Sequence, residues 1–264
     1  MLKKSLVDEL MELSNPELDK KIVKTFGIKD TLCMDIFDES DGGYVMKKDI
    51  RNQLIDVSDN FIDFIGVDFF IHDIVLTGSL ANYNWSEYSD IDLHILLDMN
   101  ELGGDEDKTS EAFSEIVKEF FDGKKQLWNN THNVTIKGFE VEIYVQDVNE
   151  PHISTGVYSI LNNEWVVEPT KKKEDIDDGA ILEKGEYFAK IIDSMISKAD
   201  SRKDQTKSIN DLKDKIKKFR QSGLEKGGEY SYENLTFKLL RRNGYIKKLL
   251  DLKNSVIDKK LSLT

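Results

Sequence analysis

The chain contains 264 residues, of which 39% are hydrophobic and 33% are charged, and its formal net charge is −13. The apolar residues suffice for a hydrophobic core, and no apolar run approaches the ~18 residues that a membrane-spanning helix needs. The negative net charge disfavours loose binding to long polyanions such as duplex nucleic acid. Because Cys33 is the sole cysteine, an intrachain disulfide is excluded, and we expect a cytoplasmic protein.

The charge is distributed unevenly along the chain. Residues 202–264 contain 17 Lys and Arg against 8 Asp and Glu, a net charge of +9, so the residues before them must carry −22. Either this basic part presents ordinary solvated helical faces, or it forms a basic wall for phosphates that the acidic body of the chain holds.

In chain order, the first predicted elements are helices. Residues 1–30 carry two short helical patterns, the first of them amphipathic. Ser14 or Asn15 can cap the second helix, and Pro16 fits its first turn. Apolar residues then recur at helical spacing over residues 48–65, which predicts a longer helix.

The next segment combines a small-residue turn with an alternating strand. An apolar strand leads to Gly78-Ser79, and the sequence then alternates polar and apolar residues with the period of a β-strand. This alternation puts Asp90, Asp92 and His94 on one face of the strand. Two carboxylates on one strand face can share a hard cation, and a Gly-Ser turn offers the N–H groups and the hydroxyl that phosphate oxygens need. The combination indicates phosphoryl or nucleotidyl chemistry.

The other elements follow from the same periodicities. We expect strands over 73–76, 90–97, 133–137 and 139–145, and a hairpin of 157–160 and 165–168. We expect a helix over 110–121, with Phe113, Ile116, Val117 and Phe120 on one side. Three more helices are expected over 181–196, 209–219 and 232–261. A loop at 223–228 should separate the last two, and Asn243-Gly244 should break the last one. These elements predict an N-terminal helical segment (1–47), an α/β core (48–170) and an α-helical C-terminal domain (177–264).

The turn and the acidic strand resemble the pattern of the nucleotidyltransferase superfamily of DNA polymerase beta. That pattern is an apolar strand, Gly-Ser, roughly ten residues, Asp-apolar-Asp-apolar and a third acid on a later strand. The matching runs are Leu76-Thr77-Gly78-Ser79, Asp90-Ile91-Asp92-Leu93 and Val141-Glu142-Ile143. The resemblance covers about residues 48–150 and implies an α/β (α+β) fold with a small mixed sheet and a C-terminal helical domain. The run 76–96 also looks like an uncharacterised group of predicted nucleotidyltransferases in bacteriophages.

The resemblance implies a role for each residue of the motif. Asp90 and Asp92 are expected to bridge two Mg2+ ions, or Mn2+ in their place, about 3.5–4 Å apart. The third acid, a role that falls to Glu142, should hold the nucleophile-side ion. Gly78 would let the backbone approach the triphosphate of an NTP, and Ser79 would bind its β or γ oxygens.

The third acid has a competitor on the same strand. Glu140 and Glu142 share a face, so spacing alone does not separate them, and Glu142 is favoured because it precedes the most apolar segment of the strand. The superfamily often has Asp at this place, and Glu reaches about one methylene further. His94, on the face of the aspartates, either touches a metal-bound water or the substrate, or supports Asp92 as a partly buried histidine.

Further nucleotide contacts are expected outside the motif. Tyr158 and Tyr232 are candidates for stacking on the nucleobase, and the alternative for both is ordinary packing. Lys238, Arg241 and Arg242 lie at i, i+3 and i+4 and hence on one helix face. Relatives of polymerase beta commonly use a helical-domain Lys or Arg against the triphosphate, and the alternative is a solvated basic face.

We therefore expect an enzyme that moves a nucleoside monophosphate from an NTP such as ATP to an acceptor hydroxyl and releases pyrophosphate. The basic C-terminal region favours RNA or a nucleotide as the acceptor. The alternative is a non-catalytic nucleotide- or RNA-binding module, such as a sensor or an antitoxin-like partner. No membrane partner is expected, and the sequence leaves the acceptor, the base preference and the oligomeric state open.

Overall fold

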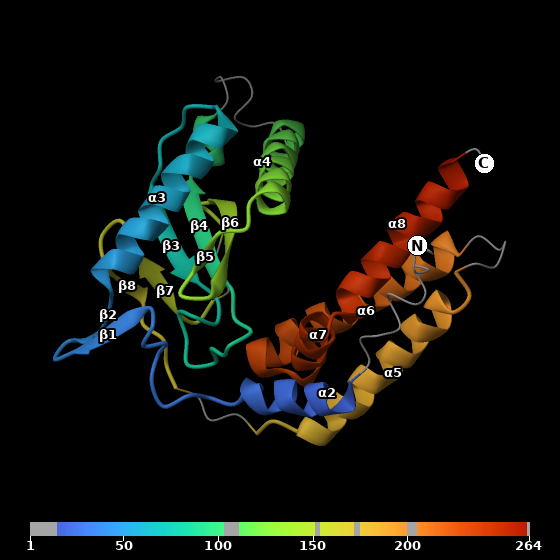
Figure 1. Ribbon diagram of the computed structural model, residues 1–264. Coiled ribbons are helices and arrows are strands. Elements are labelled where there is room, and N and C mark those ends of the chain that lie inside the picture. The colour runs from blue at the N-terminus through green and yellow to red at the C-terminus, as the bar shows by residue number, and fades with distance from the viewer. Residues whose placement is uncertain (1–14, 103–110, 151–153, 172–174, 200–204, 263–264) are drawn as a thin grey trace, which may run out of the picture. The chain divides into compact units, whose positions relative to one another are not determined.

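The computed structural model describes residues 15–102, 111–150, 154–171, 175–199 and 205–262 (Figure 1). These residues form two compact units. One is drawn from residues 28–173 and holds the β-sheet; the other is drawn from residues 1–27 and 174–264 and is helical. The first amphipathic pattern of the sequence lies outside the described residues.

The sheet unit contains a six-stranded mixed sheet with the strand order β5-β6-β4-β3-β7-β8. Its strands are β3 (Asp73–Thr77), β4 (Ile91–Leu97), β5 (Thr135–Ile136), β6 (Phe139–Asp147), β7 (Val157–Ser159) and β8 (Glu164–Val167). Strands β4 and β6 run parallel, whereas the other neighbours are antiparallel. A separate hairpin joins β1 (Phe37–Ser40) to β2 (Gly43–Met46). Each of the six predicted strands is present, with ends within two residues of those expected.

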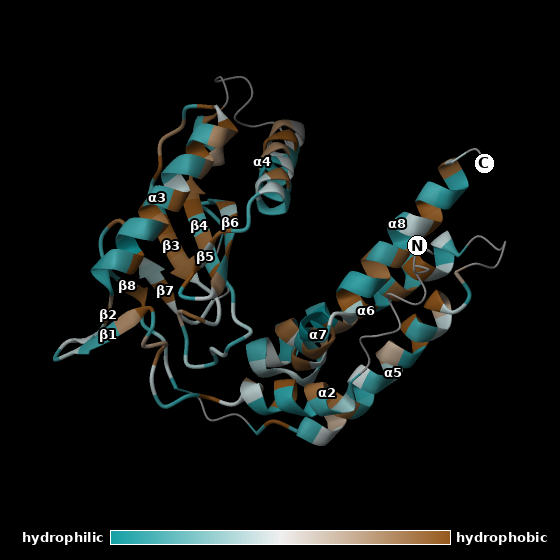
Figure 2. Ribbon diagram, viewed as in Figure 1, coloured by the Kyte–Doolittle hydropathy of each residue, from teal (hydrophilic) through white to brown (hydrophobic). Residues whose placement is uncertain are grey.

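Alternation along β4 decides which side chains enter the core. Ile91, Leu93 and Ile95 are buried, whereas Asp92 and His94 are half-buried, as the period of two predicts. In Figure 2 the central strands β3 and β4 are coloured as hydrophobic. One face of β4 therefore belongs to the core, and the other carries the acidic motif.

Two helices contribute to the same core. Helix α3 (Lys48–Ile65) has the predicted bounds and ends at Gly66, whose φ of +72° is left-handed. Helix α4 (Glu111–Thr131) runs ten residues past its predicted end, because Trp128 is buried in the core together with Val117 and Phe121. Ile116, expected on the side of Val117, is 66% exposed.

Five α-helices and short 3-10 turns make up the described part of the helical unit. These are α2 (Pro16–Val23), η1 (Lys24–Phe26), α5 (Asp178–Ile196), α6 (Thr206–Gly227), η3 (Gly228–Tyr230), α7 (Tyr232–Arg242) and α8 (Tyr245–Leu261). Helices α5 to α8 share one hydrophobic core. As predicted, Asn15 caps α2 with Pro16 behind it, and Asn243-Gly244 separates α7 from α8.

The predicted loop at residues 223–228 is wrong for most of its length, because α6 continues through Gly227. Gly223 stays inside the helix and packs against the start of α7. A Cβ at Gly223 would lie 2.5 Å from the Cβ of Glu233 and 2.7 Å from the Oγ of Ser231. This glycine therefore permits close packing of two helices and does not end one.

The predicted N-terminal segment, residues 1–47, is shared between the two units. Helix α2 packs against α5 and α7, and its Ile22 and Val23 are buried there. Phe37 and Met46 of the β1–β2 hairpin lie instead in the core of the sheet unit. The chain thus passes from the helical unit to the sheet unit after Gly27 and returns after residue 173.

Within the described residues, no helix has both the length and the apolar character that crossing a membrane requires.

Candidate active site

The Gly78-Ser79 turn closes directly against Asp92. Thr77, the last residue of β3, is paired with Asp92 of β4, so the turn begins beside this carboxylate. Gly78 has a φ of +72°, and a Cβ built on it would lie 1.8 Å from Oδ2 and 2.8 Å from Cγ of Asp92. The left-handed backbone and the lack of space both require glycine at this position.

Buried polar side chains fix the loop between the turn and β4. Asn82 is 4% exposed; its Nδ2 donates to the carbonyl of Gly78 (2.8 Å), and its Oδ1 accepts from the hydroxyl of Thr155 (2.9 Å). A Cβ on Gly156 would lie 2.1 Å from the carbonyl oxygen of Ala81. The sequence did not indicate a role for Asn82, because its partner Thr155 is 73 residues away. The available signal was that an asparagine follows closely after a turn.

The hydroxyl of Ser79 already has an acceptor. It donates to the Oγ of Ser89 (2.8 Å), which in turn accepts from the backbone N–H of Ser86 (2.9 Å). A phosphate oxygen bound by Ser79 would therefore replace Ser89 as the acceptor of this proton.

The strand register brings two acids together. Asp92 of β4 is paired with Glu142 of the parallel strand β6, and Asp90 directly precedes β4. Glu140 is exposed and pairs with Thr135 of β5, before the β4–β6 ladder begins. The two candidates for the third acid thus occupy different places, with Glu142 across the ladder from Asp92 and Glu140 towards the edge of the sheet.

Tyr144 contacts Glu142, His94 and Lys125. Its hydroxyl donates to Oε2 of Glu142, and its ring stacks on that of His94 (centroids 4.7 Å apart, planes at 19°). The Nδ1 of His94 lies 2.8 Å from Oε1 of Gln146. The ammonium of Lys125 from α4 lies 3.8 Å from the centroid of the Tyr144 ring. His94 thus takes part in a packed polar cluster beside Asp92, which accords with a supporting position.

Lys125 is a site residue that no sequence pattern indicated. Burial lowers the pKa of its ammonium, and the carboxylates of Asp122, Glu142 and Asp92 oppose this lowering because they favour the charged form. The acidic site therefore contains a cation that the protein itself supplies. No periodicity marks Lys125, because its approach to β6 depends on how α4 packs along that strand.

The donor atoms at this site suit a hard divalent cation. Asp90, Asp92 and Glu142 offer carboxylate oxygens, which Mg2+ prefers. Among the residues that the structure describes, however, no three His, Cys, Asp or Glu side chains are grouped as a ready metal site. The residues fit Mg2+ in their chemistry, and two of the three acids are adjacent in register.

The prediction that Tyr158 stacks on a nucleobase is wrong, because its side chain is 0% exposed. Its ring packs edge-on against Phe37 and Trp165. Its hydroxyl accepts from the backbone N–H of Met46 (3.1 Å) and donates to Asn163 (3.3 Å). Tyr158 therefore holds the β7–β8 hairpin to the core, and no base can reach it.

The remaining predicted contacts belong to the helical unit. Tyr232 begins α7 and packs edge-on against Phe219, with ring centroids 5.7 Å apart. Burial raises the pKa of the Tyr232 hydroxyl. Half-buried Tyr232 keeps part of its surface accessible, in contrast to Tyr158.

The basic residues of α7 differ in exposure. Arg241 is exposed, whereas Lys238 and Arg242 are half-buried. Burial lowers the pKa of Lys238; Glu229 opposes this, and the neighbouring Arg242, Arg241 and Arg220 add to it. Nη1 of Arg242 donates to the hydroxyl of Thr25 (3.0 Å), which ties this arginine to the segment after α2. Arg242 therefore has a structural contact, and Lys238 lies in a local excess of positive charge.

No protein family matches the sequence. No curated protein matches it either. Among solved structures, one match is the "Structure of STING-associated CdnE c-di-GMP synthase from Capnocytophaga granulosa", at 13% identity over 96% of this chain and 98% of that one. Its TM-score of 0.20 is too low to support an inference about fold or function. The assignment of the site rests on the residues themselves.

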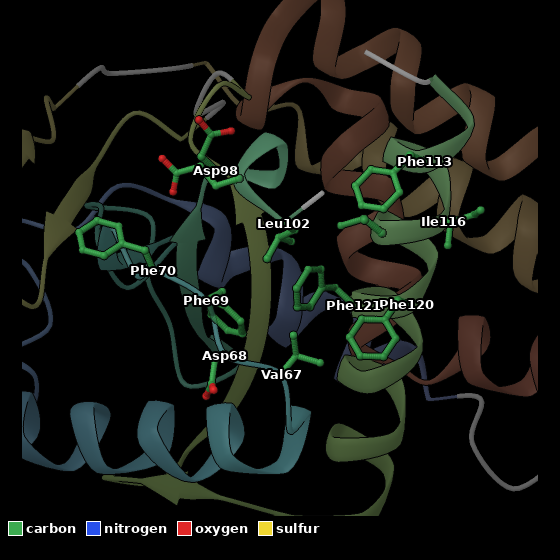
Figure 3. Close-up of a pocket in the computed structure, with 12 residues that line it drawn as sticks. Val67, Asp68, Phe69, Phe70, Asp98, Leu102, Phe113, Ile116, Phe120 and Phe121 are labelled. Carbon is green, nitrogen blue, oxygen red and sulfur yellow. The ribbon is translucent and has the colours of Figure 1, made fainter. Parts of the chain in front are cut away.

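A hollow of about 490 Å³ lies elsewhere in the sheet unit (Figure 3). Phenylalanines of α4, among them Phe113 and Phe121, face Phe69 and Leu102 across it, and Asp98 lies at its rim. The motif contributes none of its lining residues. This hollow is therefore distinct from the acidic site.

Proposed function

We propose that this protein is a metal-dependent nucleotidyltransferase that moves a nucleoside monophosphate from an NTP to an acceptor hydroxyl and releases pyrophosphate. One observation carries the proposal: the left-handed backbone of Gly78 packs against Asp92, while Glu142 lies across the ladder on the next strand. A backbone turn that exposes N–H groups beside paired carboxylates suits a triphosphate that arrives with a divalent cation.

The Gly78-Ser79 turn would bind the triphosphate of the donor. Because Gly78 carries no Cβ, its backbone would let a phosphate approach, and the Ser79 hydroxyl would exchange Ser89 for a β or γ oxygen. Lys238 and the exposed Arg241 are candidates for further phosphate contacts, and Tyr232 is a candidate for stacking on the base. Arg242 is a weaker candidate, because Thr25 already accepts a hydrogen bond from it.

The acids would serve the transfer itself. Mg2+ or Mn2+ held by Asp90, Asp92 and Glu142 would supply charge neutralisation of the phosphates and activation of the attacking hydroxyl. The acceptor oxygen forms a bond to the α-phosphorus, the bond from that phosphorus to the bridging oxygen breaks, and pyrophosphate leaves with the electron pair. Glu142 would take the proton of the acceptor hydroxyl. The basic C-terminal part of the sequence favours RNA or a nucleotide as the acceptor.

A pyrophosphate-release assay tests the proposal. The chain is incubated with each NTP, Mg2+ or Mn2+, and a panel of RNA 3′ ends, nucleotides and small alcohols. We expect release by the wild type, loss of release in Asp92→Asn, and full release in Asp59→Asn, a matched change at an exposed carboxylate on α3. Absence of release from the wild type with every donor and acceptor would refute the enzymatic function.

One observation favours a second candidate, a non-catalytic nucleotide- or RNA-binding module. Glu142, the expected third acid, already accepts a hydrogen bond from the hydroxyl of Tyr144. Such a module would bind NTP or RNA without releasing pyrophosphate, and equilibrium binding measured beside the release assay separates the two candidates.

A further inference from the structure

The acidic site contains an internal cation whose surroundings come from three elements. Lys125 reaches from α4 to Tyr144 on β6, and Tyr144 donates to Glu142, which is paired with Asp92 on β4. Lys125 is half-buried, and both Glu142 and Asp92 are near enough to interact electrostatically with its ammonium. The distance of 3.8 Å to the ring centroid is that of a close cation–π contact, which keeps the ammonium beside the acids.

A fixed positive charge beside two carboxylates has opposite effects on the two parts of a metal–nucleotide substrate. It repels a free divalent cation that approaches the acids, and it attracts the triphosphate that carries such a cation. Because the site is partly buried, water screens these effects less than at an open surface.

We infer that Lys125 makes the acidic site selective for a divalent cation already complexed with a polyphosphate and lowers its affinity for the free cation. This inference rests on the proposed function, since it concerns the same carboxylates. Lys125 acts here as a positioning and specificity-determining residue; Tyr144 keeps its ammonium close to Glu142 through the ring contact and the hydrogen bond.

The test measures binding of free Mn2+ and of the 1:1 complex of Mn2+ with inorganic tripolyphosphate, which has no base and needs no acceptor. Titration calorimetry on the full chain compares the wild type with Lys125→Met, Lys125→Gln and Lys125→Arg. Lys118→Met is the matched control, because Lys118 lies two turns earlier on α4 and pairs with Glu150 (3.0 Å) at the surface. Asp92→Asn shows which binding belongs to the site.

We expect Lys125→Met and Lys125→Gln to bind free Mn2+ about three- to ten-fold more tightly, and the complex about three- to ten-fold more weakly, than the wild type. Lys125→Arg and Lys118→Met should stay within about two-fold of the wild type for both ligands. A merely structural role of Lys125 would weaken both affinities together. That result, or unchanged affinities in both neutral variants, would overturn the inference and leave the proposed function standing. The proposed function itself fails if Asp92→Asn abolishes the binding of neither ligand, because no binding would then depend on the acidic site.

Discussion

The substitution Gly78→Ala isolates the contact between the turn and Asp92. The φ of +72° at Gly78 costs a residue with a Cβ about 1–2 kcal/mol. In addition, the new Cβ would lie 1.8 Å from Oδ2 of Asp92, so the carboxylate must rotate away. A displacement of about 1 Å in a catalytic group can lower the rate by about 100-fold. We therefore expect a modest loss of stability and a loss of at least about 100-fold in kcat for pyrophosphate release.

Gly66→Ala is the matched control. Gly66 also has a φ of +72°, but a Cβ added to it would have as its nearest neighbour the carbonyl oxygen of Asp63, at 4.0 Å. Both variants should lower Tm by about 2–4 °C for each kcal/mol lost, as thermal unfolding would show. Only Gly78→Ala should lose activity and site-specific Mn2+ binding. If Gly78→Ala releases pyrophosphate as fast as Gly66→Ala, the reasoning that Asp92 needs the space beside Gly78 is refuted.

Three further predictions concern the third acid, the loop and the hairpin. Glu142→Gln should lower kcat by about 100-fold or more while Glu140→Gln stays within about two-fold, as steady-state pyrophosphate release would show; equal losses would contradict the choice of Glu142. Asn82→Ala leaves the carbonyl of Gly78 without its buried donor and should cost about 1–3 kcal/mol in urea unfolding, and an unchanged midpoint would argue against this role. Tyr158→Phe should lose about 1 kcal/mol of stability with an unchanged KM for NTP, whereas a ten-fold higher KM would restore the stacking role.

Local patterns sufficed for the acidic strand. The alternation around Asp92 predicted both the strand and the buried face of Ile91, Leu93 and Ile95, because a period of two has one structural meaning. The bounds of α3 likewise followed from apolar residues that recur at helical spacing. Both patterns depend only on residues that are a few positions apart in the sequence.

Contacts distant in sequence could not be predicted in this way. Asn82 is fixed by Thr155 and Lys125 by Tyr144, and neither partner is marked by any spacing. Helix α4 has more apolar residues than its core contact uses, so its pattern did not distinguish buried Phe121 from exposed Ile116. The complete burial of the Tyr158 ring could not be predicted either, because a tyrosine in the sequence can be buried or exposed.

The parallel pairing of β4 with β6 has a consequence for how the chain can tolerate insertions. The connection from β4 to β6 includes η2 (Met99–Glu101), α4 and β5. The length of this connection does not determine which residues of β4 and β6 pair. Residues could therefore be added to its exposed parts without separating Asp92 from Glu142. If Val141 keeps its pairing with Ile91, a single residue inserted into β6 just before Glu142 would instead turn this carboxylate to the opposite face and place the inserted residue across from Asp92. Among homologues of this chain, length differences should gather in the connection, and the two paired strands should keep constant length.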